Sequence, residues 1–241
     1  MDRPKLSRIL LKLSGEAFAG EERFGLDAQT VNYIAQEVAK LHEAGVETAI
    51  VVGGGNLIRG ESFSKEGGID QSVADQMGML GTIVNSLALQ EAIEKIGPKT
   101  RVMSAVTIHA VCEPFIRRRA IRHLEKKRVV VLAAGTGSPF FTTDTAAALR
   151  ALELGCDAIV KATQVDGVYD ADPKKQDGAK KYETLTFEDA ISRQLGVMDQ
   201  TAFTMCREHN MPVIVLSIHE PGAIAAAARG EPVGTLVSGL V

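Results

Sequence analysis

Three consecutive glycines and a nearby arginine in this chain have the residue types that bind phosphate groups. Gly53-Gly54-Gly55 follows an apolar run, and the backbone N–H groups of such residues can point at an anion without obstruction from a Cβ atom. Arg59 adds a guanidinium that can bind two phosphate oxygens at once. The spacing fits neither the dinucleotide-binding fingerprint nor the P-loop. A tight turn is the alternative, but turns seldom need three glycines in a row, so we expect an anion site.

A second segment of this kind, residues 135–144, precedes a predicted helix and is rich in glycine and hydroxyl side chains. The free N–H groups and the dipole at a helix N-terminus favour anions. Phe140 and Phe141 are expected to form a wall for a base or sugar. The alternative is that both rings belong to the core and that Asp144 only caps the helix. We favour the binding function, and both roles can hold together.

Two lysines each stand at the end of an apolar run that has the pattern of a buried strand. Lys12 precedes the small residues Ser14 and Gly15, although a strand-end lysine can also simply reach solvent. Lys161 precedes a polar loop, residues 163–173, whose aromatic and carboxylate side chains suit a base pocket near a metal ion. Asp-Gly and Asp-Pro in this loop are also common turn signals. Together, the lysines and glycines predict an anion-rich site for phosphoryl transfer, whose catalysis is mostly positioning and charge neutralisation.

The elements that must position these residues alternate along the chain. We expect strands at 9–13, 48–52, 102–106, 129–133, 158–162, 213–217 and 235–237. We expect helices at about 28–44, 73–96, 114–126, 144–154, 187–195, 199–209 and 222–228. This order predicts an α/β fold, a three-layer αβα sandwich around a central, mostly parallel sheet. Residues 1–241 are expected to form one domain with two lobes around a cleft. Ligands in such sheets bind at the carboxyl ends of the strands, where the four segments fall.

Composition excludes several other classes of protein. With 27 Lys and Arg against 30 Asp and Glu, the net charge of −3 argues against coating nucleic acid through bulk charge. The basic stretch 117–128 is a conceivable nucleic-acid surface, but we favour a solvated face with ion pairs to Glu113 and Glu125. Three separated cysteines without a CxxC pair argue against disulfides and structural zinc, and they suit a reducing cytoplasm. We expect neither a secretory signal nor a membrane span, and therefore a cytoplasmic protein.

The chain resembles the bacterial uridylate kinases of the amino acid kinase family essentially from end to end. The matching blocks are KLSGEAF, VVGGGNLIRG, DQMGMLGTIVNSLAL, GTGSPFFTTDTAAALRA and KATQVDGVYDADP, in the family's order. ADQMGML and GTGSPFFTTD distinguish it from relatives that act on carboxylates or carbamate. The resemblance implies the carbamate kinase-like fold of this family and reversible transfer of the ATP γ-phosphoryl group to UMP, giving UDP and ADP for pyrimidine nucleotide synthesis. It also implies Mg²⁺ as cofactor, held mainly through the ATP phosphates, with UMP in the N-terminal lobe and ATP in the C-terminal lobe.

The resemblance also implies roles for individual residues. As catalytic groups it implies Lys12, Arg59 and Asp144, with Asp144 orienting Lys12 or the metal ion. The implied ATP-binding residues are Lys12, Leu13, Ser14, Gly15, Gly55, Arg59, Thr163, Gln164, Tyr169 and Asp172. The implied UMP-binding residues are Gly54, Asp75 at the ribose, Thr136, Gly137, Ser138, Pro139, Phe140, Phe141, Thr142 and Thr143. No side chain is assigned to the metal ion.

Assembly and regulation follow from the same resemblance. It implies homohexamers that GTP activates and UTP inhibits, and the region implicated in GTP activation corresponds to Gly20, Glu21, Glu22, Arg23, Phe24 and Gly25. The helix expected at 73–96 has an apolar stripe, which also suits a subunit contact, comprising Met77, Leu80, Val84, Leu87 and Ala88. Two alternatives remain: a kinase of the same fold with a carboxylate or carbamate acceptor, and a non-catalytic nucleotide-binding protein. The charges of Lys12, Arg59, Asp144 and Asp172 argue against the second.

Overall fold

A sheet of nine strands runs through the part of the chain that the structure, a computed structural model, describes: residues 3–22, 24–58, 68–171, 173, 175–176 and 178–239. The strands are β1 (Arg8–Leu13), β2 (Glu47–Val52), β3 (Thr100–Ser104), β4 (Glu113–Pro114), β5 (Val129–Ala133), β6 (Ala158–Thr163), β7 (Thr184–Thr186), β8 (Val213–Ser217) and β9 (Thr235–Ser238). Their order is β4-β3-β5-β2-β1-β6-β8-β9-β7. Among these neighbours only the β8–β9 pair is antiparallel.

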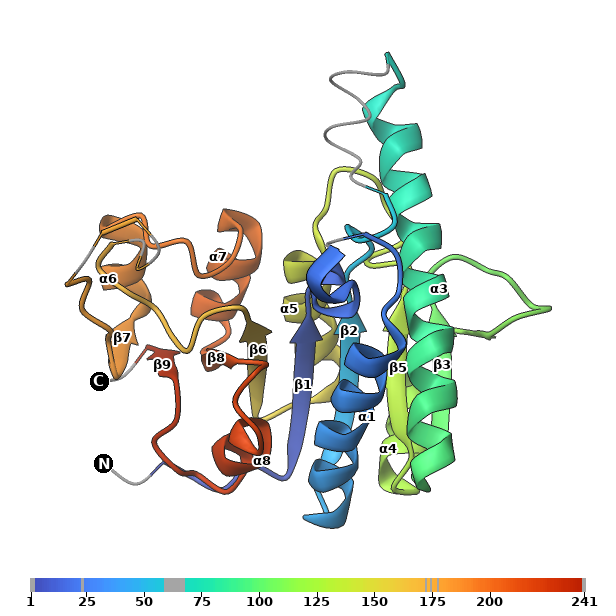
Figure 1. Ribbon diagram of the computed structural model, residues 1–241, viewed down its shortest axis with the longest axis horizontal. Coiled ribbons are helices and arrows are strands. Elements are labelled where there is room, and N and C mark those ends of the chain that lie inside the picture. The colour runs from blue at the N-terminus through green and yellow to red at the C-terminus, as the bar shows by residue number, and fades with distance from the viewer. Residues whose placement is uncertain are drawn as a thin grey trace.

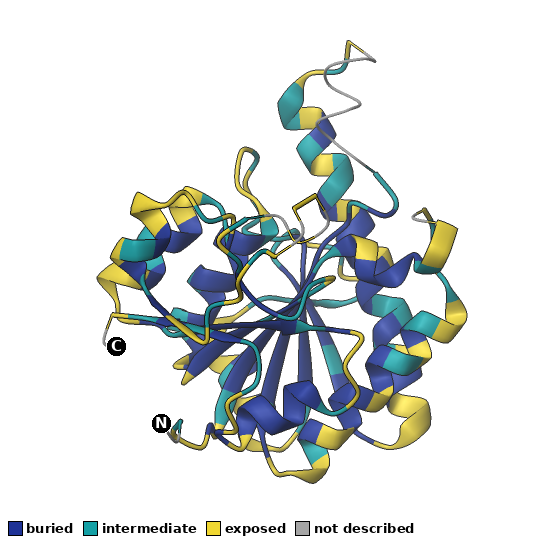
Figure 2. Ribbon diagram, turned by 60° about the vertical axis from the view of Figure 1, so that its left-hand side comes forward, coloured by how far each residue is buried: buried dark blue, intermediate teal, exposed yellow. Residues whose placement is uncertain are grey.

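Helices cover both faces of the sheet. The helices are α1 (Ala28–Glu43), α3 (Gln71–Ile96), α4 (Arg117–Glu125), α5 (Thr143–Leu154), α6 (Phe187–Ser192), α7 (Gln200–Glu208) and α8 (Ala223–Ala228), with short 3₁₀ turns η1 (Gly15–Phe18) and η2 (Gly20–Glu22). One core cluster joins α1, α3 and α8 to the sheet, and a second joins α4, α5, α6 and α7 to its other face. The central strands between them are almost entirely buried (Figure 2). The expected αβα sandwich is confirmed.

The central strands point their side chains alternately into the two clusters, as a pleated strand must. On β1, Ile9, Leu11 and Leu13 pack on the α1 and α3 side, while Leu10 packs on the α5 side. Lys12 lies two residues after Leu10, so its side chain is on the same face of the strand and faces α5. The chain leaves β1 for β2 on one side and returns to β6 on the other, so β1 lies at the switch point where such sheets bind ligands. Figure 1 shows β1, β2 and β6 pointing to the same end of the molecule.

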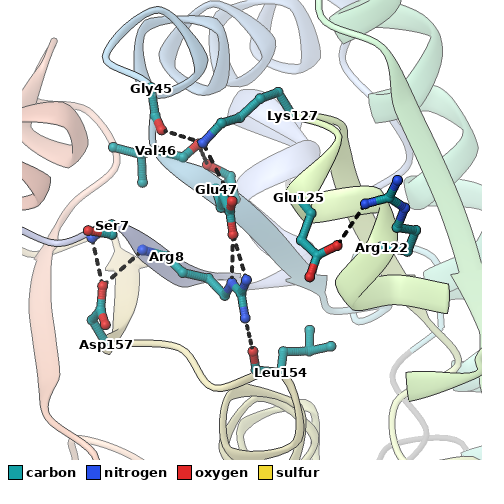
Figure 3. A network of polar contacts seen from close by, with 11 residues as sticks. Ser7, Arg8, Gly45, Val46, Glu47, Arg122, Glu125, Lys127, Leu154 and Asp157 are labelled. Carbon is teal, nitrogen blue, oxygen red and sulfur yellow. Dashed lines mark hydrogen bonds and ion pairs between the residues drawn. The ribbon is translucent and has the colours of Figure 1, made fainter. Parts of the chain in front are cut away.

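A polar network fixes the opposite, amino-terminal ends of these strands (Figure 3). Arg8 on β1 donates from Nε to Glu47 Oε2 at 2.8 Å and from Nη1 to Leu154 O at 2.6 Å. Asp157 Oδ2 accepts from the backbone N–H groups of Ser7 and Arg8, and Lys127 approaches Glu47 at 3.4 Å. This network ties together the starts of β1, β2 and β6.

Several element boundaries differ from the expectations. β3 spans Thr100–Ser104 instead of 102–106, and the short strands β4 and β7 were not expected. β7 lies in a stretch expected to be only loop, where pairing with β9 stabilises three residues that have no strong pattern of their own. Asp144 does not cap α5. The cap is Thr142, whose Oγ1 accepts from Asp144 N at 3.1 Å and Thr145 N at 3.2 Å, which leaves the Asp144 carboxylate for other contacts.

The apolar stripe expected on helix 73–96 is divided in α3, because Leu87 and Ala88 pack against the core while Leu80 and Val84 lie on the open side. Leu80 and Val84 are exposed, as is Val73 two turns before Leu80. The buried face combines apolar core residues, Met79, Ile83, Leu89 and Ile93, with small and polar ones, Gly81, Thr82, Asn85 and Ser86. Small side chains there let other backbone segments approach the helix closely. No helix in the described residues is long and apolar enough to cross a membrane.

Candidate active site

Two lysines and one aspartate form a buried charge cluster at the carboxyl end of the sheet. Lys12 on β1 and Lys161 on β6 are direct partners in the parallel register, and both face α5. Asp144 in the first turn of α5 lies between them. Its Oδ1 is 2.7 Å from Lys12 Nζ, and its Oδ2 accepts a hydrogen bond from Lys161 Nζ at 2.7 Å. Two like charges on neighbouring strands would repel each other, and the shared carboxylate offsets this repulsion.

The cluster is enclosed enough to shift the pKa values of Asp144 and Lys161. The three side chains are only 8%, 12% and 14% exposed for Lys12, Asp144 and Lys161. Burial by itself would raise the pKa of the Asp144 carboxyl, but the two ammonium charges outweigh it and lower the pKa below its usual value. Burial lowers the pKa of Lys161, and Asp144 opposes that effect. With all three groups ionised, the cluster keeps one net positive charge facing the ligand side of the sheet.

The glycine loop after β2 packs directly on the loop after β1. Gly53 N donates to Leu13 O at 2.9 Å, and a Cβ atom on Gly53 would lie 2.5 Å from Gly15 N. A Cβ atom on Gly15 would in turn collide with the backbone of Gly55. These contacts explain why both loops need glycine. They also place the backbone of residues 53–55 on the same side of the molecule as Lys12, as the phosphate-site hypothesis requires.

A first cavity of about 620 Å³ opens between Lys12, the glycine loop, α3 and the loop after β5. Of the residues assigned to UMP by resemblance, those lining it are Gly54, Asp75, Thr136, Ser138, Phe141, Thr142 and Thr143. Gly15 and Gly55, which the resemblance assigns to ATP, also line this cavity. Gly137, Pro139 and Phe140 belong to the same loop but not to the lining.

Asp75 holds the loop after β5 in place across this cavity. Its Oδ2 accepts from Phe140 N at 2.8 Å, and its Oδ1 accepts from Gln71 Nε2 at 2.8 Å. Phe140 has a left-handed backbone with φ of 68°, a conformation that a bulky residue rarely adopts and that often marks functional loops. Both phenylalanine rings are exposed, Phe140 at 74% and Phe141 at 52%. The alternative that these rings belong to the core is therefore wrong.

A second cavity of about 670 Å³ lies on the other side of Lys12, between β6 and the segment that follows α6. Residues assigned to ATP that line it are Lys12, Ser14, Thr163, Gln164 and Tyr169. Leu13 is fully buried beneath both loops. Gln164 Oε1 lies 2.7 Å from His219 Nε2, and Tyr169 donates to Asp166 Oδ1 at 2.5 Å. Lys12, Ser14 and Glu16 line both cavities, so the two spaces meet at Lys12.

Three assigned residues lie outside the described residues: Arg23, Arg59 and Asp172. Gly20, Glu21, Glu22 and Phe24, from the region assigned to GTP, line a third cavity of about 750 Å³ beside the start of α1. Gly25 lies next to that cavity's lining in the chain but is not part of it. Within the described residues, no group of three His, Cys, Asp or Glu side chains is arranged to hold a metal ion.

Sequence reasoning missed several residues that build the site. Lys161 was recognised as a strand-end cation but not as a partner of Asp144, because the register that aligns it with Lys12 is not visible in the sequence. Asp199 accepts hydrogen bonds from Thr142 and Thr145 and so fixes the start of α5. In the sequence, Asp199 is marked only by its position just before a predicted helix, which indicates a helix cap and not a contact with α5. Thr82 Oγ1 accepts from Ala134 N at 2.7 Å and ties α3 to the loop after β5.

The basic stretch 117–128 is largely occupied by local contacts. Arg122 lies 3.1 Å from Glu125 and Arg119 lies 3.7 Å from Glu113, which confirms the expected ion pairs. Arg117 donates to Glu153 O.

Comparisons with known proteins agree with this geometry. A model of the amino acid kinase family matches residues 7–217. The uridylate kinase of Paramagnetospirillum magneticum is 54% identical, over 97% of each chain, and that of Dichelobacter nodosus is 55% identical, over 98% of this chain and 97% of the relative. The crystal structure of UMP kinase from Bacillus anthracis superimposes with a TM-score of 0.95 at 40% identity, covering 99% of this chain and 98% of that one. The crystal structure of UMP kinase from Ureaplasma parvum superimposes with a TM-score of 0.91 at 37% identity, covering 98% of this chain and 100% of that one. The chain belongs to the amino acid kinase family, and within it to the uridylate kinases.

Proposed function

We propose that this protein is a UMP kinase, which transfers the γ-phosphoryl group of ATP reversibly to UMP and forms ADP and UDP for pyrimidine nucleotide synthesis. The observation that carries the proposal is the meeting of two nucleotide-sized cavities at one buried lysine, Lys12. A phosphotransferase needs this arrangement, because donor and acceptor phosphates must approach in line. The names of the relatives support UMP as the acceptor.

The reaction needs no general base. A phosphate monoester has its second pKa near ~6, so the UMP phosphate is largely dianionic at neutral pH. One of its oxygens forms a bond to the γ-phosphorus while the bond from that phosphorus to the β,γ-bridging oxygen breaks. The electron pair of the broken bond stays with ADP. The protein must therefore hold two anions together and stabilise the charge that builds up between them.

The charge cluster can supply this stabilisation. Asp144 holds the Lys12 ammonium at the junction of the cavities, and Lys161 keeps the cluster positive overall. A cation about 4 Å from a phosphate oxygen contributes roughly 4 kcal/mol near a protein surface. The backbone N–H groups of the glycine loop can also point their partial positive charges at the phosphates, because no side chain obstructs the approach. Arg59, outside the described residues, is proposed to contribute a guanidinium to the same phosphates.

Mg²⁺ fits this site as a partner of the nucleotide more than of the protein. Both Asp144 oxygens are engaged by ammonium groups, which leaves the ATP phosphates as the main oxygen ligands. When bound, Mg²⁺ neutralises charge on the phosphates and so lowers the repulsion between donor and acceptor.

We propose that the first cavity binds UMP and the second binds ATP. The Asp75 carboxylate on α3 would accept hydrogen bonds from the ribose hydroxyls of UMP. The loop that comprises Thr136–Thr143 would surround the rest of the nucleotide. Thr163, Gln164, Tyr169 and Asp172 would contact the adenosine, and Asp172 is outside the described residues. Residues 1–241 then form one domain, in which the N-terminal lobe binds the acceptor and the C-terminal lobe binds the donor.

An acceptor series tests the proposal. ADP formation from ATP, measured with a coupled assay, should depend on UMP and Mg²⁺, with little turnover of aspartate, N-acetylglutamate or carbamate. Comparison with CMP measures how strictly the base is read. Turnover of a carboxylate or carbamate in place of UMP would make the protein a different kinase of this fold. Nucleotide binding without turnover of any acceptor would make it a non-catalytic binding protein.

We further propose that the protein acts in the cytoplasm as a homohexamer that GTP activates and UTP inhibits. The exposed apolar residues Val73, Leu80 and Val84 on α3 support a contact with a second copy of the chain. Light scattering tests the assembly: the unchanged protein should have six times the mass of the monomer, and Leu80→Glu should form smaller species. A monomeric unchanged protein would contradict the assembly. Activity assays with GTP or UTP added test the regulation.

A further inference from the structure

A buried pair of asparagines connects the glycine loop to α3. Asn56 at the end of the loop and Asn85 on α3 have no exposed surface. Asn85 Nδ2 donates to Asn56 Oδ1 at 2.7 Å, and Asn56 Nδ2 donates to Asn85 Oδ1 at 3.1 Å. The remaining amide hydrogens are used as well, because Asn85 Nδ2 donates to Gly53 O at 2.7 Å and Asn56 Nδ2 to Gly25 O at 2.6 Å. All four N–H bonds of the two side chains are thereby satisfied.

This network permits one orientation of the amides. Turning the Asn56 amide over would place its Oδ1 against Gly25 O, and turning the Asn85 amide over would place its Oδ1 against Gly53 O. Each change would leave buried oxygen atoms facing each other without a proton between them, which is costly at a buried site. The position of the glycine loop on α3 is therefore set by side-chain hydrogen bonds with a defined geometry.

Asn56 also binds a third segment of the chain, the turn at Gly25. Gly25 N donates to Asn56 O at 2.9 Å, so the two residues are joined in both directions. On its other side, the glycine loop touches the loop after β1 and borders the first cavity. A shift of the turn at Gly25 would thus move Asn56 directly and, through it, the N–H groups of residues 53–55. These contacts form one connected path from the surface turn to the phosphate side of the cavity.

We infer that Asn56 and Asn85 are positioning residues for phosphoryl transfer, and that they couple the turn at Gly25 to the glycine loop. Neither side chain lines the cavity, so they act through the backbone that they hold. The inference rests on the proposed kinase function. According to this inference, a displacement of the turn at Gly25 moves the N–H groups of the glycine loop that face the reacting phosphates. Such a displacement would change kcat more than it changes the binding of the nucleotides.

The first experiment compares two neighbouring buried polar residues of α3. Asn85→Ala deletes the bonds to Asn56 and Gly53, whereas Ser86→Ala deletes only a bond within the helix, from Ser86 Oγ to Thr82 O at 2.7 Å. We expect Asn85→Ala to lower kcat at least ten-fold with the KM values for UMP and ATP changed less than three-fold. Ser86→Ala should keep kcat within two-fold, even where both variants lose Tm. A normal kcat for folded Asn85→Ala would assign the pair a purely structural role and overturn the inference.

The second experiment tests the coupling with two glycines of the same backbone conformation. Gly25 has φ of 81° and Gly45 has φ of 77°, and a Cβ atom on either would meet no other atom within 4 Å. Alanine at either position therefore causes the same kind of backbone strain without a collision. Gly45 lies at the opposite end of the molecule, in the network of Figure 3. We expect Gly25→Ala to lower kcat at least three-fold and Gly45→Ala to leave it unchanged.

Equal kcat values for the two alanine variants would overturn the coupling. The unchanged protein is assayed in parallel to separate this result from failure of the kinase proposal. An unchanged protein that forms no ADP with UMP refutes the proposed function, whereas an active one with insensitive variants refutes only the inference.

Discussion

Lys12 and Lys161 share one carboxylate, so the two lysines are not equivalent. Lys12 lies at the junction of the cavities, whereas Lys161 is also bound to Val197 O at 2.5 Å and is held back against the C-terminal part of the sheet. Lys12 lines both cavities, whereas Lys161 lines only the second, and the positive charge of Lys161 keeps Asp144 from neutralising Lys12 completely. This division of roles makes different predictions for the residues around the site.

Lys12→Ala should lower kcat by roughly 10²–10³-fold, because it removes a preorganised charge at the transition state. The fold should survive, since Asp144 keeps its ion pair with Lys161. Steady-state turnover with both substrates saturating measures the loss, and circular dichroism checks the fold. Lys95→Ala, at an exposed lysine of α3, is the matched control and should be fully active. A Lys12→Ala protein with near-normal turnover would remove Lys12 from the mechanism.

Asp75→Asn should mainly raise the KM for UMP, by about ten-fold, because a neutral amide is a weaker acceptor for ribose hydroxyls. The amide can still accept from Phe140 N, so the loop after β5 should stay in place. Measuring both KM values separates the two cavities. A raised KM for ATP with an unchanged KM for UMP would show that the nucleotides bind in the reverse arrangement.

At the scale of elements, the alternating pattern was enough to predict the layers and nearly all the helices and longer strands. It failed where neighbours decide the structure. Of the apolar stripe expected on this helix, Leu87 and Ala88 pack on the core but Leu80 and Val84 are exposed, and α3 also buries Gly81, Thr82 and Asn85. The sequence could not show this, because the helix packs against a backbone loop that needs small residues and hydrogen-bond donors. The alternative that Asp144 caps its helix is also wrong, because Thr142, two residues earlier, provides the cap.

The close packing of the glycine loop on α3 predicts a difference between adjacent glycines. A Cβ atom on Gly54 would lie 2.5 Å from Gly78 O and 3.1 Å from Thr82 N, whereas one on Gly55 would meet nothing within 4 Å. Gly54→Ala should therefore cost about 1–3 kcal/mol of unfolding free energy and lower the Tm by several degrees. Gly55→Ala should leave the Tm nearly unchanged. Differential scanning calorimetry measures both, and equal Tm values would contradict the close approach.

At the scale of the whole molecule, two buried thiols link stability to alkaline pH. Burial raises the pKa of Cys156 and of Cys206 to about 12, from an ordinary value of 9.0. Above about pH 9 the unfolded chain releases these protons while the native chain keeps them. The native state then binds more protons than the unfolded state, so the free energy of unfolding falls as the pH rises from about 9 to 12. Below pH 9 this contribution is fully present.

Two such thiols together give a slope of roughly −2.7 kcal/mol per pH unit within that window. Urea unfolding at a series of pH values, under reducing conditions, measures the slope for the unchanged protein. The double variant Cys156→Ala, Cys206→Ala will be less stable at neutral pH because it loses packing, but its slope should be flatter. The loss of packing lowers the free energy of unfolding by the same amount at every pH, so it does not affect the slope. A difference between the two slopes therefore reports only the release of protons from the thiols. Equal slopes for the two proteins would mean that the thiols ionise alike in the native and unfolded chains.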